Sequence, residues 1–494
     1  MSAAALVYPN QLFADHPALA ETDRVVLHED ALFFRDAQYP ARYHKLRLAL
    51  HRASMRRFAD GLRQRGRAVE YIAWADGVAT ADLLARLAQD GVTTVRLCEP
   101  VDFILEQRLA RGAENAGIAL DVLKTPLFLN TREDNRRFFE GRTRYFMADF
   151  YKHQCRRLGV MVDGDGEPAG GQWSFDHDNR EKLTRQALAE VPPLPEVPQD
   201  DYAREAAAYV EQHFPDHVGQ SGPLPYPTTH EGAADWLAAF VRERYERFGP
   251  YEDAVEPGQS SLYHGVLTPM LNTGLLTPQQ VLDAALGADD VPINSREGFV
   301  RQVIGWREYM RATYDLEGVT MRNANMWGFE REIPEAWYTG TTGLAPVDDV
   351  VPRVLQTGYA NHIERLMVLG GALFLSRFHP REVYRWFMEM FIDAYDWVMV
   401  PNVYGMSQHA AGPLITTKPY VSGSNYLRKM SHYPRGEWEA EWDGLFWTFM
   451  SDYREPIEGY RRMSMLTGHL DRMSGEKLAA HHAAAERYLA RIAA

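Results

Sequence analysis

TTVRLC, at residues 93–98, is followed by an amphipathic stretch at 103–116 that ends at Gly117, and then by ALDVL at 119–123. A short β-branched run, a helical stretch and a second short run are typical of two parallel strands joined by a crossover helix. Glycine supplies the left-handed residue with which many helices end. This segment therefore predicts a parallel sheet that is covered by helices.

The same alternation extends back to the start of the chain. Two further amphipathic stretches end at Gly66 and Gly91, which places helices at 43–65 and 80–90. Earlier strands are expected at 4–8 (AALVY), 24–28 (RVVLH) and 68–73 (AVEYIA). Together these elements predict a doubly wound parallel sheet, whose ligands bind at the carboxyl ends of the strands. No GxGxxG follows the first strand and no GxxxxGKS/T occurs, so a dinucleotide or P-loop site has no motif here.

The composition changes after residue 160. Residues 161–230 are rich in Gly, Pro and acidic residues and contain one helical stretch, at about 200–213, which is typical of an interdomain connector. Beyond it strand signals nearly vanish, and helical periodicity is found at 231–247, 278–286, 295–313, 348–370, 380–397, 439–453 and 474–492. We predict an α/β + α chain with an α/β domain at 1–130, a basic helix and linker at 131–229, and an all-helical domain at 230–494.

Length, charge and cysteine content exclude several classes of protein. The chain has 494 residues, enough for two or three domains. Its two cysteines, Cys98 and Cys155, exclude a disulfide framework, a CxxC zinc site and a four-cysteine cluster. A net charge of −14 argues against coating of nucleic acid but allows a local basic groove. No positive leader and no apolar run of ~18 residues occurs, so we expect a soluble cytoplasmic protein without a membrane segment.

Aromatic and basic residues are unevenly distributed. Eight of the eleven tryptophans lie at or after Trp306, where they fit either core packing or a flavin pocket. The helical stretch at 293–311 places Arg301, Gln302 and Arg307 beside aromatic residues, which suits phosphate or base recognition or simply a charged outer face. Residues 41–67 carry nine Arg or Lys against one Asp, which fits solvated helix faces or contact with phosphates. HExxH, GxSxG and kinase motifs are absent.

One histidine and one ion pair are candidates for a site. His362 lies in YANHIERLMV with Leu366 one helical turn further on. A lone histidine on an apolar helix is more often a core residue than a catalyst, but one that faces a cleft can deliver a proton near neutral pH. Asp393 lies in an apolar segment and needs a partner, for which Arg365 is the obvious candidate.

Several longer motifs, in order along nearly the whole chain, resemble the photolyase/cryptochrome family, and most closely its bacterial (6-4) photolyases and cryptochromes of the iron–sulfur group. The matching segments are NQL (10–12), YHKLRLALHRASMRRFA (43–59), GGQWSFDHDNR (170–180), EGFVRQVIGWREYMR (297–311), YANHIERLM (359–367), DAYDWVMVPNVYGMSQ (393–408) and TKPYVSGSNYLRKMS (417–431). The resemblance implies an N-terminal antenna domain and a helical domain that holds a U-shaped FAD. It implies no metal in the catalytic site.

The resemblance also implies roles for individual residues. The loop on the flavin phosphates matches His264, Gly265, Val266, Leu267 and Thr268, with Arg307 nearby. Arg365 and Asp393 match a salt bridge beside the isoalloxazine ring. His362 matches the proton donor of (6-4) repair, and Gln302 stands where enzymes acting on cyclobutane dimers carry Glu. The remaining catalytic candidates, which match the surroundings of the lesion, are Tyr420, Tyr426 and Leu366.

The chain departs from the family pattern at several positions. Pro346 stands where the first cluster cysteine would fall, and residues 431–447 contain none of the other three, so we expect no iron–sulfur cluster. Met399 occupies the position opposite flavin N5, where a thioether cannot exchange a proton. The electron-transfer residues expected are Trp386, Trp337 and Tyr338, with Phe387 in place of Tyr. Phe33 replaces the Glu that contacts a ribityl-lumazine antenna, so the antenna is left open.

Three functions follow as hypotheses. The first is light-dependent repair of (6-4) photoproducts by electron transfer from reduced FAD, in a monomer that binds UV-damaged DNA through a local basic patch. The second is a cryptochrome-like blue-light photoreceptor that binds FAD and repairs nothing. The third is a helical flavoprotein with a structural role. His362, Gln302, Tyr420 and Tyr426 favour repair, because a sensor needs no lesion pocket.

Overall fold

The computed structural model describes residues 2–22 and 24–493 of the chain. Its N-terminal part contains one sheet of five parallel strands in the order β3-β2-β1-β4-β5. Ala5 of the central strand pairs with Val25 on one side and with Arg96 on the other. The strands are β1 (Ser2–Val7), β2 (Arg24–His28), β3 (Ala68–Ile72), β4 (Val92–Cys98) and β5 (Ala119–Leu123), and all five lie where the sequence predicted them.

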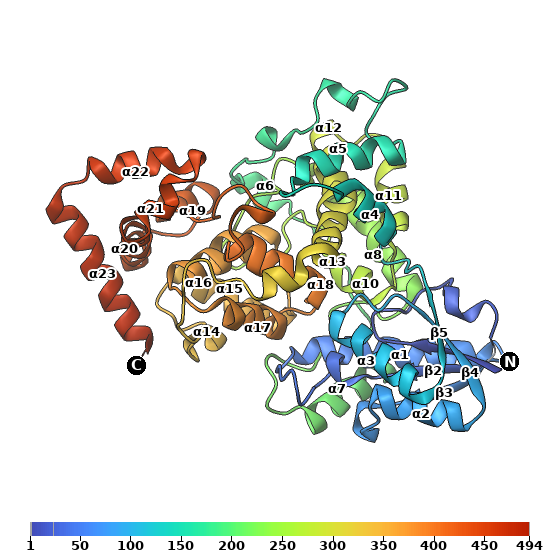
Figure 1. Cartoon of the computed structure of the whole chain (residues 1–494). Helices are drawn as coiled ribbons and strands as arrows, with labels where there is room; N and C mark the ends of the chain where they lie inside the picture. The colour runs from blue at the N-terminus through green and yellow to red at the C-terminus, as the bar shows by residue number, and fades with distance from the viewer. Residues whose placement is uncertain (1, 23, 494) are drawn as a thin grey trace.

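Helices cover both faces of this sheet, as the strand order requires (Figure 1). The chain moves outward from β1 to β3 and then crosses back to β4, so right-handed crossovers place the helix after β2 on one face and the next two on the other. These helices are α1 (Lys45–Gln64), α2 (Thr80–Gln89) and α3 (Phe103–Ala116). In agreement, α2 packs against α3, whereas α1 packs against α7 (Asp201–His213), the helix predicted within the connector.

The basic segment after the sheet differs from the single helix predicted there. It forms two helices, α4 (Arg132–Phe139) and α5 (Met147–Leu158). Gly141, with φ of 72°, adopts the left-handed backbone that turns the chain between them. A further short helix, α6 (Arg185–Ala189), precedes α7.

The rest of the chain is helical and extends away from the sheet toward the C-terminus (Figure 1). None of its described helices is both long and apolar enough to cross a bilayer. The α-helices are α8 (His230–Glu243), α9 (Tyr245–Phe248), α10 (Thr268–Thr273), α11 (Pro278–Leu286), α12 (Ile293–Val300), α13 (Glu308–Arg322), α14 (Ala336–Thr339), α15 (Ala345–Thr357), α16 (Gly371–Leu375), α17 (Pro380–Met390), α18 (Asp396–Val400), α19 (Ser424–Met430), α20 (Glu437–Asp452), α21 (Arg454–Glu458), α22 (Ser464–Asp471) and α23 (Gly475–Ala493).

Besides the stretch 231–247, which is interrupted at Arg244 between α8 and α9, two stretches predicted as continuous helices are broken. The stretch 348–370 is interrupted at Gly358, which has φ of 66° and lies so close to Ile392 that an added Cβ would be 3.0 Å from the Ile392 Cβ. The stretch 380–397 is interrupted after Met390, where Phe391 is extended. The two breaks pack against each other, because the Ile392 amide donates to the Gly358 carbonyl. Periodicity alone could not reveal them, since both flanks are apolar.

Three segments have π-helical hydrogen bonding, which inserts a residue into the helical turn and is frequent at functional sites. They are Arg301–Arg307 between α12 and α13, Glu364–Gly370 before α16, and Pro401–Ser407 after α18. A widened turn changes which side chains face a neighbouring helix. All three segments contribute side chains to the same cavity, described below.

A buried arginine, Arg52, forms ion pairs both with the sheet domain and with α7 of the connector. Arg52 of α1 lies between Glu29 (Nη1 to Oε1 3.1 Å) and Glu205 of α7 (Nη2 to Oε1 2.6 Å), with its guanidinium 3.5 Å from the centre of the Tyr209 ring. The Glu29 side chain is fully inaccessible to solvent. Burial raises the pKa of Glu29, and the charge of Arg52 opposes this.

Substitution of Arg52 tests how much these ion pairs contribute to stability. Arg52→Ala leaves the Glu29 carboxylate buried without its cation, which should cost about 3 kcal/mol in the free energy of unfolding of the sheet domain. Arg204→Ala, which removes an exposed ion pair to Asp201 on the same α7, should leave stability unchanged within error. Urea denaturation followed by circular dichroism measures both. Equal effects of the two substitutions would contradict the assignment.

Candidate functional site

The helical part encloses a cavity of about 330 Å³. Its wall is formed by the loop before α10, the start of the 359–366 segment, the break between α17 and α18, and the three π-helical segments. Of the predicted residues, those in this wall are His264, Gly265, Val266, Leu267, Thr268, Gln302, Arg307, His362, Arg365, Leu366, Asp393 and Met399. The structure therefore brings together residues that lie up to 135 positions apart in the sequence.

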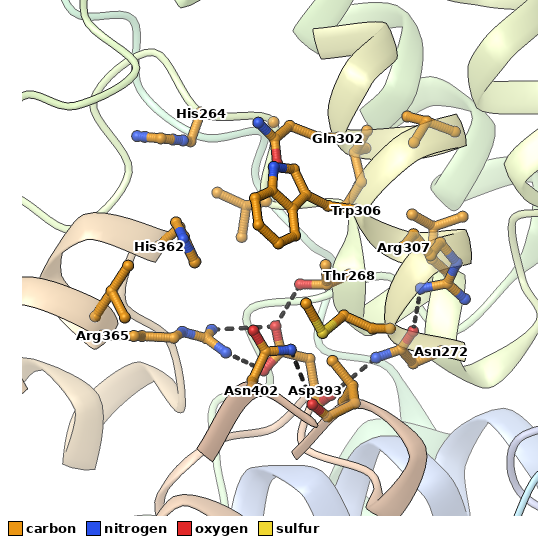
Figure 2. Close-up of a pocket in the computed structure, with 18 of the residues that line it drawn as sticks. His264, Thr268, Asn272, Gln302, Trp306, Arg307, His362, Arg365, Asp393 and Asn402 are labelled. Carbon is orange, nitrogen blue, oxygen red and sulfur yellow. Dashed lines mark hydrogen bonds and ion pairs between the residues drawn. The ribbon is translucent and has the colours of Figure 1, made fainter. Parts of the chain in front are cut away.

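An ion pair between Arg365 and Asp393 lies in the cavity wall, in the lower part of Figure 2. Two parallel contacts join them, from Nη1 to Oδ1 at 2.8 Å and from Nη2 to Oδ2 at 3.1 Å. The Thr268 hydroxyl also donates to the Asp393 carboxylate, and the Asn272 side chain donates to the Asp393 carbonyl at 2.8 Å. Only 5% of the Asp393 side chain is exposed. The break after α17 is what turns this carboxylate toward Arg365.

Arg307 is a second cation in the wall, held by neutral groups. Its Nη1 donates to Asn272 Oδ1 at 2.7 Å, and its guanidinium lies 4.8 Å from the Trp397 ring centre. Burial lowers the pKa of Arg307 to about 10. Among residues 2–22 and 24–493, no carboxylate is within ion-pair distance of it. This cation is therefore suited to an anionic ligand.

Two histidines also line the cavity, with His362 next to Arg365 on the same segment and His264 above them in the view of Figure 2. The Nε2 atom of His264 is buried and has no hydrogen-bond partner in the described structure. His362 exposes its ring to the cavity, but protein surrounds the cavity on most sides. This desolvation, together with the charge of Arg365, lowers the pKa of His362 to about 4. Burial and the neighbouring His362 likewise lower the pKa of His264 to about 4. Both rings are neutral at pH 7 in the free protein.

Gln302 lies beside Trp306 and is bound to a carboxylate that the sequence did not reveal. Its Nε2 donates to Glu252 Oε1 at 2.6 Å. Glu252 is largely buried, and desolvation raises its pKa to about 7. Neighbouring Asp253 also lines the cavity, and burial raises its pKa to about 6.

Tyr420 and Tyr426 do not contribute to the cavity wall. Both are half-buried beside it, within electrostatic range of Asp176 and Arg180, and Tyr426 is also near Asp253. Lys418 lies near Arg462 and Arg180. Burial lowers the pKa of Lys418, and these two positive charges lower it further. No carboxylate in the described part of the chain forms an ion pair with Lys418 or Arg462. Arg180, Lys418 and Arg462 are called the rim cations below.

The residues predicted for electron transfer lie behind the wall. Phe387 lines the cavity and meets Trp386 edge to face, with ring centres 5.2 Å apart. The Trp386 indole donates to the Trp337 carbonyl at 3.1 Å, and the Tyr338 hydroxyl donates to Glu389 at 2.7 Å. The ring that separates Trp386 from the cavity is thus a phenylalanine, which is not readily oxidised.

Several wall residues were missed from the sequence or considered only as core residues. Trp306 and Trp397 were considered with the other tryptophans, and their position in the wall depends on the tertiary fold. Asn402, in the third π-helical segment, was part of a quoted motif but was not singled out. Phe299 was considered only as part of an apolar helix face, and Tyr359 only within a quoted motif. The wall residues missed altogether include Glu252, Asp253, Asn272, Phe248, Leu271 and Val281.

Phe33 and the two cysteines lie away from this cavity. The Phe33 ring, 3% exposed, packs against Tyr8, His51 and Tyr395 between the sheet and the helical part. Cys98 and Cys155 are buried and unbonded. In the described residues, no cluster of three or more His, Cys, Asp or Glu side chains could hold a metal ion.

Comparisons with known proteins identify the lineage of this chain. A family model described as deoxyribodipyrimidine photo-lyase-related protein matches residues 5–226. A (6-4) photolyase of Agrobacterium fabrum is 33% identical and aligned over 96% of each chain. A class III photolyase structure from Agrobacterium tumefaciens has a TM-score of 0.60 and 16% identity, covering 100% of this chain and 98% of that one. An archaeal photolyase structure from Sulfolobus tokodaii, described with two FAD molecules, has a TM-score of 0.57 and 16% identity, covering 93% and 95%.

The low pKa of His362 can be measured directly. The ring proton signals of His362, assigned by their loss in His362→Gln, should titrate in the free protein with a midpoint near pH 4, because burial and Arg365 disfavour the imidazolium. Proton NMR of protein labelled at histidine follows this. Arg365→Gln, with one of the two causes removed, should move the midpoint upward. A wild-type midpoint at or above pH 6 would contradict the described environment.

Proposed function

This chain belongs to the photolyase/cryptochrome family, and we propose that it is a DNA photolyase that repairs (6-4) pyrimidine photoproducts with FAD. The observation that carries the proposal is the convergence of His362, Gln302 and the Arg365–Asp393 pair on one cavity. A proton-exchanging group, an amide and a buried ion pair around one space suit light-driven repair, which needs orientation and a proton but no nucleophile or metal.

The wall residues fit FAD. Arg307 offers a cation without a carboxylate partner, and the orphaned Nε2 of His264 offers a polar contact. Trp306, Trp397 and Met399 offer apolar surface for a planar ring. Arg365 and Asp393 would flank that ring, and the loop at His264–Thr268 would contact the phosphates. Bound FAD, once reduced, supplies the light-driven electron that the repair requires.

The protein's own residues would handle the lesion and its proton. Gln302 would hydrogen-bond the damaged pyrimidine, and His362 would deliver the proton. Because His362 is neutral in the free protein, it must gain its proton when the anionic DNA enters and raises its pKa. Leu366 would exclude water on the same side. The unpaired lesion leaves the base stack at lower cost than a normal pair, which favours its entry into a closed cavity.

The rim cations support binding of DNA by a chain of net charge −14. Burial lowers the pKa of Lys418, and the like charge of Arg462 lowers it further, so the two cations repel each other in the free protein. A phosphate placed between them relieves this repulsion. Tyr420 and Tyr426 adjoin these cations and offer rings on which bases could stack. These features suit a local basic patch beside one lesion pocket.

A blue-light photoreceptor is the alternative function. It is favoured by Phe387, a redox-inert ring between the cavity and Trp386, and by Met399, which offers no exchangeable proton. We assign no iron–sulfur cluster to the chain, because it has two cysteines and Pro346, the second residue of α15, stands where a ligand would be needed. We also propose no antenna pigment at Phe33, because the Phe33 ring itself fills that space and packs against His51 and Tyr395.

Repair of a defined lesion tests the proposed function. The reduced, FAD-loaded protein is illuminated with an oligonucleotide containing one (6-4) photoproduct, and restored thymines are measured by chromatography. We expect repair by the wild type and loss of at least ~100-fold in His362→Ala with FAD content unchanged, since general acids contribute about that much. Absence of repair by a wild type with full FAD content would reject the proposal in favour of the photoreceptor.

The basic patch is tested by DNA affinity in the dark. Lys418→Ala and Arg462→Ala should each weaken binding to all duplexes and lower the slope of log affinity against log salt by about 1, because each removes one phosphate contact. Arg111→Ala, an exposed arginine on α3, is the matched control. Fluorescence anisotropy at several salt concentrations gives the slopes. A control slope reduced as much as the other two would argue against a patch at the rim.

A further inference from the structure

The side-chain amide of Gln302 forms a hydrogen bond with the Glu252 carboxylate. An ionised carboxylate accepts hydrogen bonds only, so the contact of 2.6 Å must come from the amide nitrogen. Gln302 then has its oxygen on the opposite side of the planar amide. Figure 2 shows that side facing Trp306 and the cavity. A ligand in the cavity therefore meets a hydrogen-bond acceptor at this point.

Glu252 is itself fixed by a second contact. Its Oε2 accepts from Asn179 Nδ2 at 3.1 Å, and Arg301 Nη2 lies 3.8 Å from the same oxygen. Gly298 leaves the room for this arrangement, since an added Cβ would be 2.6 Å from Asn179 Nδ2 and 3.2 Å from Glu252 Oε2. The carboxylate is thus held between two amides, of which only Gln302 reaches the cavity wall.

Charged groups from every neighbouring element act on Glu252. Arg301, in the π-helical segment, stabilises the carboxylate, whereas Asp253 and Asp176 destabilise it. Further charged or titratable groups around this cluster are Glu297, Arg180, His264, Tyr426 and Tyr151. Burial is the largest influence and raises the pKa of Glu252 to about 7. Both protonation states are therefore populated at neutral pH.

We propose that Glu252 is a positioning residue whose protonation state decides which end of the Gln302 amide faces the lesion. Ionised Glu252 accepts from the amide nitrogen and presents the amide oxygen to the cavity. Protonated Glu252 donates its proton in a hydrogen bond to that oxygen, so the amide turns and presents its N–H groups. The only bond made or broken is the O–H bond of Glu252, whose proton comes from solvent and returns to it. This inference rests on the proposed lesion-binding role of Gln302.

The consequence is a pH-dependent choice of hydrogen-bonding partner. A pyrimidine edge carrying an N–H or O–H donor is matched when Glu252 is ionised and mismatched when it is protonated. Loss of this contact should weaken binding of a lesion that presents such a donor by about tenfold as pH falls through about 7, which is the effect of one hydrogen bond, and it opposes the gain from proton uptake by His362. Undamaged duplex, which does not enter the cavity, should not share this dependence.

Dark binding of (6-4) DNA between pH 5.5 and 8.5 tests this with four proteins. The wild type should show a step near pH 7 at which about tenfold in affinity is lost toward acid pH, on top of the gain that proton uptake by His362 gives to every variant. Glu252→Gln, whose side-chain amide does not titrate, should lack this step. Gly298→Ala should also flatten the profile, because it displaces Asn179 and Glu252 without changing charge. Asp253→Asn, which removes a negative charge that raises the pKa of Glu252, should keep the step but move its midpoint to lower pH. A Glu252→Gln profile that parallels the wild type would overturn the proposal.

A second measurement needs no DNA and separates failure of this inference from failure of the proposed function. Infrared spectra of the wild type should contain a carboxylic acid band that titrates near pH 7 and is absent in Glu252→Gln. The side-chain amide signals of Gln302 in nitrogen NMR should shift with the same midpoint. If the amide signals of Gln302 do not shift as Glu252 titrates, the inference is rejected even if repair is found. Amide signals that follow it would sustain the orientation change even if (6-4) DNA is not the ligand.

Discussion

The buried ion pair between Arg365 and Asp393 is the constraint on which the site depends. Asp393 reaches Arg365 only because α17 ends at Met390 and the chain runs extended before α18 begins. The opposing break at Gly358 admits Ile392 and lets the 359–366 segment approach. Removing either partner would leave a desolvated charge, which costs several kcal/mol. The ion pair thus holds the interruptions at Gly358 and after Met390 in place. These interruptions in turn shape the side of the cavity at which the ion pair lies.

A second consequence of burial is the distribution of protons around the cavity. Desolvation acts on all its ionisable groups, but in opposite directions. It lowers the pKa of His362 and His264 and raises that of Glu252 and Asp253. In the free protein the histidines are therefore neutral, and the acids hold a proton part of the time at pH 7. In the function that we propose, entry of an anionic ligand would change this balance and link binding to protonation.

The sequence predicted the sheet and the family more completely than it predicted the cavity. The five strands were recovered because β-branched runs and helix-ending glycines such as Gly117 are local signals. The Arg365–Asp393 pair was also found, since an acid in an apolar segment needs a partner. The breaks at Gly358 and after Met390 were missed, because both flanks keep an apolar periodicity. Glu252 was missed because its burial arises from segments around Asn179 and Arg301 that only the tertiary structure brings together.

The central claim is that one cavity, bounded by three π-helical segments, receives both FAD and a lesion extruded from DNA. A crystal structure of the FAD-loaded protein with a duplex containing one (6-4) photoproduct tests it most directly. The account predicts the damaged pair outside the base stack, between His362 and Gln302, with the Arg365–Asp393 pair intact and the flanking phosphates at the rim cations. A lesion that remains stacked in the duplex, or a flavin bound outside the wall described for this cavity, would contradict it.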